Sequence, residues 1–257
     1  MPLRVDLNAD VGESFGRWVL GDDERLMRSL TSANIACGGH AGDPGVMRKT
    51  LQLARAAGVV VGAHPGFPDL AGFGRREMAV EPEELEGLML YQIGALAAIA
   101  SAEGTQLRHV KPHGALYTAA TRDAGLAAAI ARAVAAFDPR LIVVGPPQSE
   151  LLRSAVAAGL AVAAEGFADR SYEPDGSLTP RGRTGAVIED PAVVSHRAVR
   201  LVCDGEVSTP AGTVLRLRVD TICVHGDTPG AAGLAERVRA GLEAAGVTVT
   251  AFHDRQA

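Results

Sequence analysis

Short apolar segments alternate with helical patterns along nearly the whole chain, and this alternation restricts the folds open to it. Strands that are apolar on both faces and separated by helices are typical of a parallel sheet covered by helices. The segments with strand character are LRVDLNA, SANIAC, VVVGAH, LRHVKP, LIVVG, LAVAAE, DTICVHG and VTVTAF. Helices are predicted over residues 43–58, 81–103, 122–136, 148–158 and 230–245. The pattern therefore predicts an α/β protein.

The number of these units favours a closed barrel over an open sheet. Seven or eight strand and helix units in 257 residues fit a parallel β/α barrel of the TIM type, and the nucleotide fingerprint of an open doubly wound sheet is missing. Residues 170–219 interrupt the rhythm with a loop-rich stretch, and the alternating pattern near 200–219 predicts a β-hairpin insertion. We expect one barrel domain over residues 1–257.

Composition and charge argue against several classes of protein. A formal net charge of -5 provides no basic stripe for a nucleic acid. No apolar run approaches the roughly 18 residues of a membrane span, and the N-terminus shows no leader pattern, so we expect a cytoplasmic protein without membrane contact. The three cysteines lack C-x-x-C spacing, which argues against a disulfide framework and against a structural zinc site.

Polar residues collect at the ends of the predicted strands. In a parallel barrel the carboxyl ends of all strands open on one face, and the loops there build the active site. The side chains at these positions are therefore candidates for a shared site. They are Asn8, Asp10, Glu13, Asn34, Cys37, His40, His64, Lys111, His113, Glu165, Asp169, Arg170, His225 and Asp227.

Each of these residues also has a purely structural interpretation. A single histidine after a strand often caps a loop, but four histidines at four strand ends favour a functional cluster. Asp10 is interpreted as functional, whereas Glu13 is left open between a helix cap and a site residue. The pattern favours a structural role for Cys37, His109, His196 and His253.

The loop GFPDLAGFGRRE, residues 66–77, combines three glycines with Arg75 and Arg76. Backbone amides beside guanidinium groups suit an anion such as phosphate or a carboxylate. The chain contains no G-x-x-x-x-G-K-[ST] motif, so a P-loop is excluded and any nucleotide must be held in another way.

Several long motifs together resemble the LamB/YcsF family. They are LNADVGE, NIACGGHAGD, GAHPGFPDLAGFGRR, VKPHGALY, EGFADR and VHGD, in the order of the family. The resemblance extends from about residue 3 to 252. It implies a barrel of the glycoside hydrolase/deacetylase type and the activity of a 5-oxoprolinase, of which the family forms the A subunit. This activity is the ATP-dependent opening of 5-oxo-L-proline to L-glutamate, with Mg²⁺ and with subunits B and C as partners.

The residues suggest how such chemistry could be divided. A lactam is a poor electrophile, so phosphate must be held, water activated and an oxyanion stabilised. We expect Asp10, with Glu13 or His40, to act as general base, and Lys111 and His113 to stabilise negative charge. Substrate or phosphate binding is expected for Asn8, His64, Arg75, Arg76, Glu165, Asp169, Arg170, His225 and Asp227.

Two other functions fit the same residues. Aspartate and histidines at barrel strand ends also form metal sites in hydrolases, and here the ligands would be Asp10, His40, His64 and His113. The barrel could instead be a lactam-binding subunit without chemistry of its own. The many ionisable groups argue against a pure binding pocket, because such pockets are mostly apolar.

Overall fold

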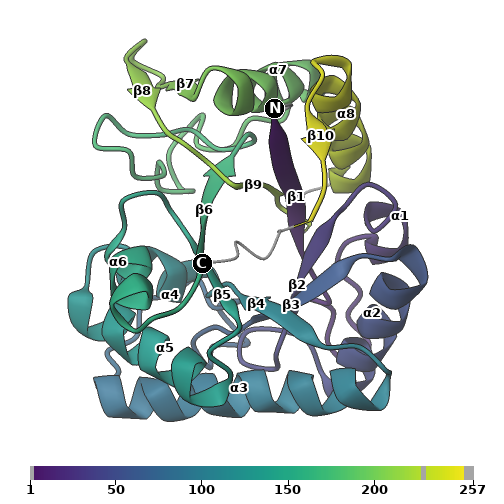
Figure 1. Ribbon diagram of the computed structural model, residues 1–257, viewed down its shortest axis with the longest axis vertical. Coiled ribbons are helices and arrows are strands. Elements are labelled where there is room, and N and C mark those ends of the chain that lie inside the picture. Colours follow the sequence, from purple (N-terminus) through teal and green to yellow (C-terminus); the bar gives the residue numbers. More distant parts are fainter. Residues whose placement is uncertain (1–2, 227–229, 252–257) are drawn as a thin grey trace.

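A computed structural model describes residues 3–226 and 230–251, and within them seven parallel strands close into a ring (Figure 1). The ring closes because the last strand pairs both with the sixth strand and with the first. Its members in spatial order are β1 (Arg4–Val11), β2 (Ser32–Ala36), β3 (Val60–His64), β4 (Leu107–Val110), β5 (Ile142–Gly145), β6 (Val162–Phe167) and β9 (Thr221–Val224). The predicted parallel β/α barrel is confirmed.

Helices form the outer layer of the barrel. In Figure 1, α3 runs along the lower edge beside α5, and α7 lies next to α8 at the upper edge. The helices are α1 (Asp23–Leu26), α2 (Pro44–Ala57), α3 (Pro82–Ala102), α4 (Gly114–Ala120), α5 (Ala124–Phe137), α6 (Glu150–Ala157), α7 (Pro191–Cys203) and α8 (Ala231–Ala244). The helices that connect successive strands thus lie outside the ring.

The ends of α2 show why the sequence signals a helix there. The Asp43 side chain accepts hydrogen bonds from the backbone N–H groups of Gly45 and Val46, and Pro44 occupies the first turn, where no partner for its nitrogen is needed. Gly58 ends the helix at φ 68°, a left-handed conformation that glycine adopts without steric cost.

A short strand, β10 (Thr248–Val249), lies outside the ring and extends one edge of β1. It pairs with Arg4 and Val5, whereas β9 pairs with the next four residues of β1. This edge of β1 is thereby paired from Arg4 to Ala9, and β2 pairs with the other edge from Asn8 to Val11, so the end that carries Asp10 is fixed.

The region 170–219 differs in part from the prediction. A two-stranded antiparallel hairpin does form, from β7 (Glu206–Ser208) and β8 (Val214–Arg216). Before it, however, α7 is a regular barrel helix and includes residues 200–203, which the alternating pattern assigned to the hairpin. The helical spacing of its buried residues Val194, Ala198 and Leu201 explains the difference, because it directs one face of α7 onto the barrel.

The expectation that no segment resembles a membrane span also needs correction. Among the described residues, the 21-residue helix α3 is long and apolar enough to cross a membrane by length and composition alone. It packs instead against α5 in the outer layer of the barrel (Figure 1). Its apolar composition therefore serves helix packing in this fold.

A buried carboxylate lies inside the ring near the amino ends of the strands. Asp6 accepts hydrogen bonds from the hydroxyls of Thr31 (2.7 Å), Ser32 (2.7 Å) and Thr221 (2.5 Å). Burial raises the pKa of Asp6 to about 6, although the three hydroxyls oppose that shift. Asp6 therefore binds its proton more tightly in the folded state than in the unfolded state.

We predict that Asp6 makes the barrel less stable as pH rises. Its folded pKa lies above the unfolded value, so its contribution is most favourable below pH 4 and is lost as pH rises through 6. Relative to Asp6→Asn, the free energy of unfolding of the wild type should fall by about 2 kcal/mol between pH 4 and pH 7. Urea unfolding at a series of pH values measures this; a difference that does not change with pH would contradict it.

A second prediction concerns Gly62 in β3. A Cβ atom at this position would overlap the ring of His109, which is buried inside the barrel. Gly62→Ala should therefore destabilise the fold by about 1–3 kcal/mol in urea unfolding. The matched control is Gly94→Ala in α3, where an added Cβ would meet no atom of the described residues within 4 Å apart from the backbone of its own helix; it should stabilise the protein by about 0.5–1 kcal/mol. Equal effects of the two changes would refute the packing argument.

Candidate active site

Five polar groups predicted from the sequence come together inside one end of the barrel. Asp10 lies in β1, His64 is the last residue of β3, and Lys111 and His113 follow β4. His40 reaches the same place from the loop after β2. All five are buried. The strand-end rule therefore identifies a real spatial cluster.

The Lys111 ammonium lies at the centre of this cluster. Its Nζ is 2.9 Å from Asp10 Oδ1, 2.8 Å from Glu165 Oε1 and 3.1 Å from Cys223 Sγ. Burial alone would lower the pKa of Lys111, but Asp10 and the other acidic groups around it raise that pKa well above its ordinary value. Lys111 is thus a permanent cation in the barrel.

Asp10 is held as the matching anion. Besides Lys111, it accepts a hydrogen bond from Asn34 Nδ2 at 2.8 Å, and its Oδ2 lies 3.4 Å from His64 Nε2. Burial would raise the pKa of Asp10, but His64 and Lys111 together hold it well below its ordinary value. Asp10 is therefore ionised at neutral pH.

Glu165 completes the surroundings of the ammonium from β6. Its Oε1 accepts a hydrogen bond from Asn8 Nδ2 at 3.0 Å, and its Oε2 accepts one from the Tyr117 hydroxyl at 2.8 Å. Tyr117 was not among the predicted site residues, although it ends the motif VKPHGALY. Both carboxylate oxygens of Glu165 are thus engaged by polar groups from other parts of the barrel.

A cluster of three imidazoles and one carboxylate lies beside Asp10. We call Glu13, His40, His64 and His113 the imidazole cluster; one potential ligand atom from each lies within 4.8 Å of the others. His40 Nε2 is 3.2 Å from Glu13 Oε1, and His113 Nδ1 is 3.0 Å from His64 Nε2. Three nitrogens and one carboxylate oxygen form a donor set that could hold a metal ion.

Two rings of the imidazole cluster stack face to face. The centroids of His40 and His113 are 3.6 Å apart with an interplanar angle of 3°. Burial lowers the pKa of both rings well below the ordinary histidine value, and the neighbouring histidines add to this effect. Stacked, buried imidazoles of this kind are uncharged at neutral pH.

Asp169 and His225 form a second buried pair beside the ring of Phe167. His225 Nδ1 is 2.8 Å from Asp169 Oδ2, and the His225 ring stacks on Phe167 at 5.3 Å. The Lys111 ammonium lies 5.5 Å from the centre of the same phenyl ring. The pair therefore borders the site, while Asp227 lies outside the described residues.

The three predicted arginines occupy different positions relative to the buried polar cluster. Arg170 is buried and donates to the carbonyls of Ala186 (3.1 Å) and Thr179 (2.7 Å), so its guanidinium fastens the segment after β6. Arg76 pairs with Asp69 within its own loop. Arg75 is exposed and lies 4.9 Å above the ring of Phe73, next to His113. Of the three, Arg75 is best placed to meet an entering anion.

Cys37 and His109 occupy structural positions, in agreement with their interpretation from the sequence. The Cys37 thiol donates to the carbonyl of Ile35, and burial raises its pKa to about 12, which leaves it unreactive. His109 Nε2 lies 2.8 Å from Asn34 Oδ1 and so supports the side chain that binds Asp10.

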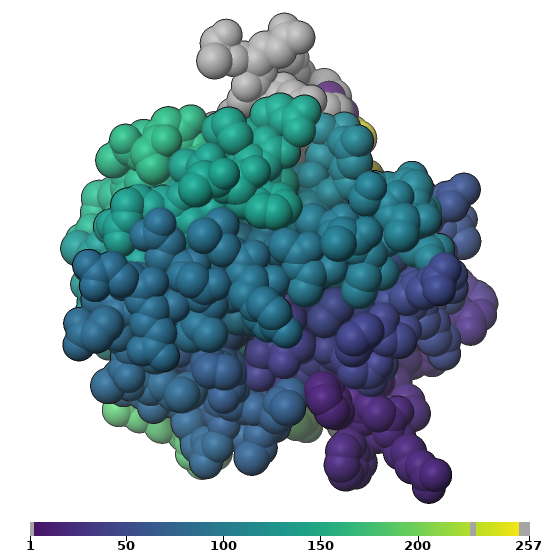
Figure 2. Space-filling model, turned by 90° about the horizontal axis from the view of Figure 1, so that it is seen from below, coloured from purple at the N-terminus to yellow at the C-terminus, as the bar shows by residue number. Residues whose placement is uncertain are grey.

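The surface near the first strand end carries exposed apolar residues. The side chains of Trp18 and Val19 are 76% and 84% exposed, in the loop that follows β1. In Figure 2, the dark purple early part of the chain projects from the lower edge of the molecule. Large apolar side chains in such a position are typical of protein contact surfaces.

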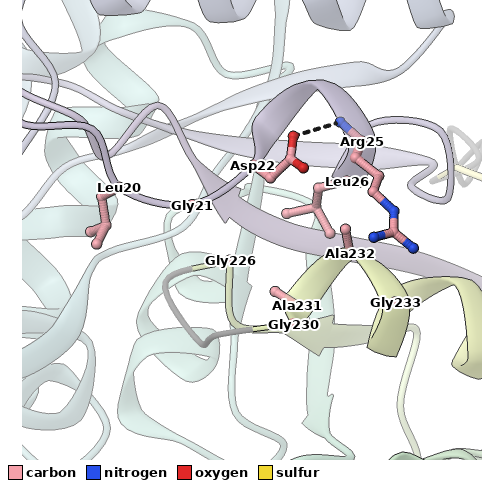
Figure 3. Close-up of a pocket in the computed structure, with 10 residues that line it drawn as sticks. All are labelled: Leu20, Gly21, Asp22, Arg25, Leu26, Gly226, Gly230, Ala231, Ala232 and Gly233. Atoms are coloured by element: carbon pink, nitrogen blue, oxygen red, sulfur yellow. Dashed lines mark hydrogen bonds between the residues drawn. The ribbon is translucent and has the colours of Figure 1, made fainter.

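A pocket with a different lining lies close to this site (Figure 3), because its residue Gly226 follows His225 and lies against the backbone of Asp10. It lies between α1, where Asp22 accepts a hydrogen bond from the Arg25 backbone N–H, and the start of α8. Its lining consists of Leu20, Gly21, Asp22, Arg25, Leu26, Gly226, Gly230, Ala231, Ala232 and Gly233. None of these is a predicted site residue, so the buried cluster is the better candidate for chemistry.

Comparisons with known proteins give matches over nearly the full chain. The model of the LamB/YcsF family matches residues 5–257. The 5-oxoprolinase A subunit of Methylococcus capsulatus is 59% identical over 252 residues, which cover 98% of this chain and 97% of the relative. The crystal structure of a lactam utilization protein from Thermus thermophilus has a TM-score of 0.92 and 51% identity, covering 97% of this chain and 100% of that one.

A more distant solved structure shares the fold alone. A T48 deacetylase with substrate superposes with a TM-score of 0.50 at 16% identity, over 97% of this chain and 88% of that one. Parallel β/α barrels host many unrelated activities, so this likeness describes architecture only.

We predict that the Tyr117 hydroxyl contributes to stability through Glu165. Tyr117→Phe leaves one buried carboxylate oxygen without its donor, which should cost about 1–3 kcal/mol of unfolding free energy. The control is Tyr91→Phe on α3, where the side chain is 73% exposed and the change should stay within about 0.5 kcal/mol. Urea unfolding of both variants checks this; similar small losses in the two would show that the bond is unimportant.

Proposed function

The chain belongs to the LamB/YcsF family, and we propose that it acts as the A subunit of an ATP-dependent 5-oxoprolinase. Such an enzyme opens the ring of 5-oxo-L-proline to give L-glutamate. Support comes from the 59% identity with a protein named as the A subunit of 5-oxoprolinase, over nearly the full length of both chains. The buried charged site at the barrel mouth supplies suitable chemistry.

ATP is needed because the ring amide resists attack by water. Its nitrogen lone pair is delocalised into the carbonyl, and transfer of the γ-phosphoryl group to the amide oxygen removes that stabilisation. Water then adds to the ring carbon, the C–N bond breaks while a proton moves to nitrogen, and a second water releases phosphate. ADP and phosphate are the other products, and Mg²⁺ accompanies the nucleotide.

Lys111 is the observation that carries the proposal. A buried cation held by two carboxylates is preorganised, so it can stabilise negative charge that develops on the substrate oxygen without rearranging. Asp10, ionised and 2.9 Å from the same ammonium, is assigned to hold the attacking water and receive its proton. The two groups are direct neighbours, so both can act on one bound lactam.

The remaining predicted residues are assigned to binding. Arg75, exposed above Phe73 beside the imidazole cluster, is placed to meet the substrate carboxylate or a phosphate. Asn8 and Glu165 orient Lys111, and the pair of Asp169 and His225 borders the opposite side. Arg76 and Arg170 keep loops in place and act on the substrate only indirectly.

We place the complete reaction in a cytoplasmic complex with subunits B and C. Neither of the two lysines, Lys49 and Lys111, lies in a P-loop motif, so nucleotide binding in the complex does not use that loop in this chain. The exposed Trp18 and Val19 follow the strand that carries Asp10 and offer a contact surface beside the site.

We predict that neutralising Lys111 removes turnover without unfolding the barrel. In the complex reconstituted with subunits B and C, Lys111→Met should lower kcat for glutamate formation from 5-oxo-L-proline by about 10²–10³-fold, the usual loss for a preorganised charge-stabilising group. Glutamate and ADP are measured together, and circular dichroism reports folding.

Lys49→Met is the matched control, because Lys49 is exposed on α2 and should leave kcat unchanged. Lys111→Arg keeps the charge that balances the two carboxylates and serves if the methionine variant unfolds. A folded Lys111→Met variant with wild-type turnover would instead favour a lactam-binding subunit whose partners perform the chemistry.

A further inference from the structure

The hydrogen bonds of the imidazole cluster fix which nitrogens carry protons. His64 Nδ1 lies 2.7 Å from the backbone carbonyl of Lys111, and His113 Nε2 lies 2.9 Å from the carbonyl of Phe73. A carbonyl oxygen only accepts hydrogen bonds, so in each ring the nitrogen that faces the carbonyl carries a proton. His64 Nε2 and His113 Nδ1 are therefore the nitrogens left to face the imidazole cluster.

These two nitrogens lie opposite each other. His64 Nε2 and His113 Nδ1 are 3.0 Å apart, and both residues are buried. Two ring nitrogens at that distance need a cation between or beside them, either a shared proton or a metal ion. The Glu13 carboxylate completes the arrangement, since its Oε1 is 3.2 Å from His40 Nε2 and 3.5 Å from His113 Nδ1. One carboxylate and three imidazoles thus converge on one point.

The outer hydrogen bonds have the pattern found around metal-bound histidines. A ligating imidazole generally donates its other N–H to a backbone carbonyl or a carboxylate, which fixes the ring and increases the basicity of the ligating nitrogen. His64 and His113 both do so here. The third ring, His40, stacks on His113, and its buried Nδ1 has no hydrogen-bond partner among the residues that the structure describes.

The charged groups around the cluster also favour a cation. Asp10, Glu13 and Glu165 bring three carboxylates into this end of the barrel, all of them buried. Asp10 and Glu165 share one ammonium, that of Lys111. Negative charge gathered beside these imidazoles attracts a divalent cation, and burial in a medium of low dielectric constant strengthens that attraction.

We propose that Glu13, His40, His64 and His113 bind one divalent first-row transition-metal ion, of which Zn²⁺ is the best match. Imidazole nitrogen with a single carboxylate oxygen suits Zn²⁺ and its neighbours, whereas Mg²⁺ and Ca²⁺ prefer ligands that are all oxygen. Such an ion supplies Lewis-acid polarisation of a carbonyl or activation of a water. The inference stands on donor geometry and is independent of the proposed oxoprolinase activity.

The ligand set differs in one member from the set predicted from the sequence. Asp10 was the expected carboxylate ligand, but its Oδ1 is bound to Lys111 and Asn34, and only its Oδ2 approaches His64, at 3.4 Å. Glu13, which the sequence left open, reaches two of the imidazoles. Asp10 therefore lies beside the imidazole cluster and is not one of its proposed ligands.

Metal analysis of the full chain tests the proposal. Protein purified without chelator should contain about one first-row divalent ion per chain by mass spectrometry. After removal of this ion, added Co²⁺ should give one equivalent of visible absorption bands typical of low-coordinate cobalt, and Zn²⁺ should displace it. Saturating Zn²⁺ should also raise the Tm of the apoprotein by about 5 °C.

Substitution of single ligands distinguishes metal binding at this site from metal binding at the protein surface. Glu13→Gln and His64→Asn should each weaken Co²⁺ binding at least about tenfold, whereas His196→Asn, exposed on α7, should bind as the wild type does. If a variant unfolds, the Zn²⁺-dependent change in Tm of the wild type remains as the measurement.

Two results would overturn the site. One is a folded wild type that takes up no stoichiometric Co²⁺ and shows no Tm change with Zn²⁺; this would mean that a shared proton separates His64 from His113. The other is uptake that survives both ligand substitutions. Since neither measurement uses turnover, loss of the metal site and loss of the proposed oxoprolinase activity are distinguishable.

Discussion

The ion pairs of Lys111 are the constraint on which the interior of this barrel depends. An ammonium removed from water loses several kcal/mol of hydration, and two carboxylates at 2.8 and 2.9 Å must offset that loss. Those carboxylates come from β1 and β6, and the lysine comes from the end of β4. One charge therefore connects three strands of the ring, and the remaining polar side chains arrange themselves around it.

Neighbouring side chains hold the Asp10 carboxylate beside Lys111 in a fixed orientation. Asn34 donates to Asp10, and His109 supports Asn34 from the layer below. Gly62 leaves room for the His109 ring, because any side chain there would overlap it. A packing requirement in the barrel wall is thus connected, through two hydrogen-bonded layers, to the orientation of the Asp10 carboxylate.

The sequence predicted the site residues that stand directly at the ends of strands. It missed a hydrogen-bond partner that lies on a helix. Asp10, His64, Lys111 and His113 stand directly at or after apolar segments, so their convergence follows from the barrel geometry alone. Tyr117, a partner of Glu165, could not be predicted in this way, because it reaches the carboxylate from helix α4 and not from a strand end. α7 was not among the predicted helices, because its residues 200–203 were assigned to the alternating segment that follows them.

The loop after β3 contains an unfavourable backbone conformation beside the site. Phe73 has φ 55°, a left-handed conformation that is unfavourable for a residue with a side chain. Its carbonyl lies 2.9 Å from His113 Nε2, and its ring meets His40 and His113 edge to face. The next residue, Gly74, approaches both histidines so closely that a Cβ would lie 2.7 Å from His40. This unfavourable conformation directs the Phe73 carbonyl toward His113 Nε2. The other nitrogen of that ring, Nδ1, then faces into the imidazole cluster.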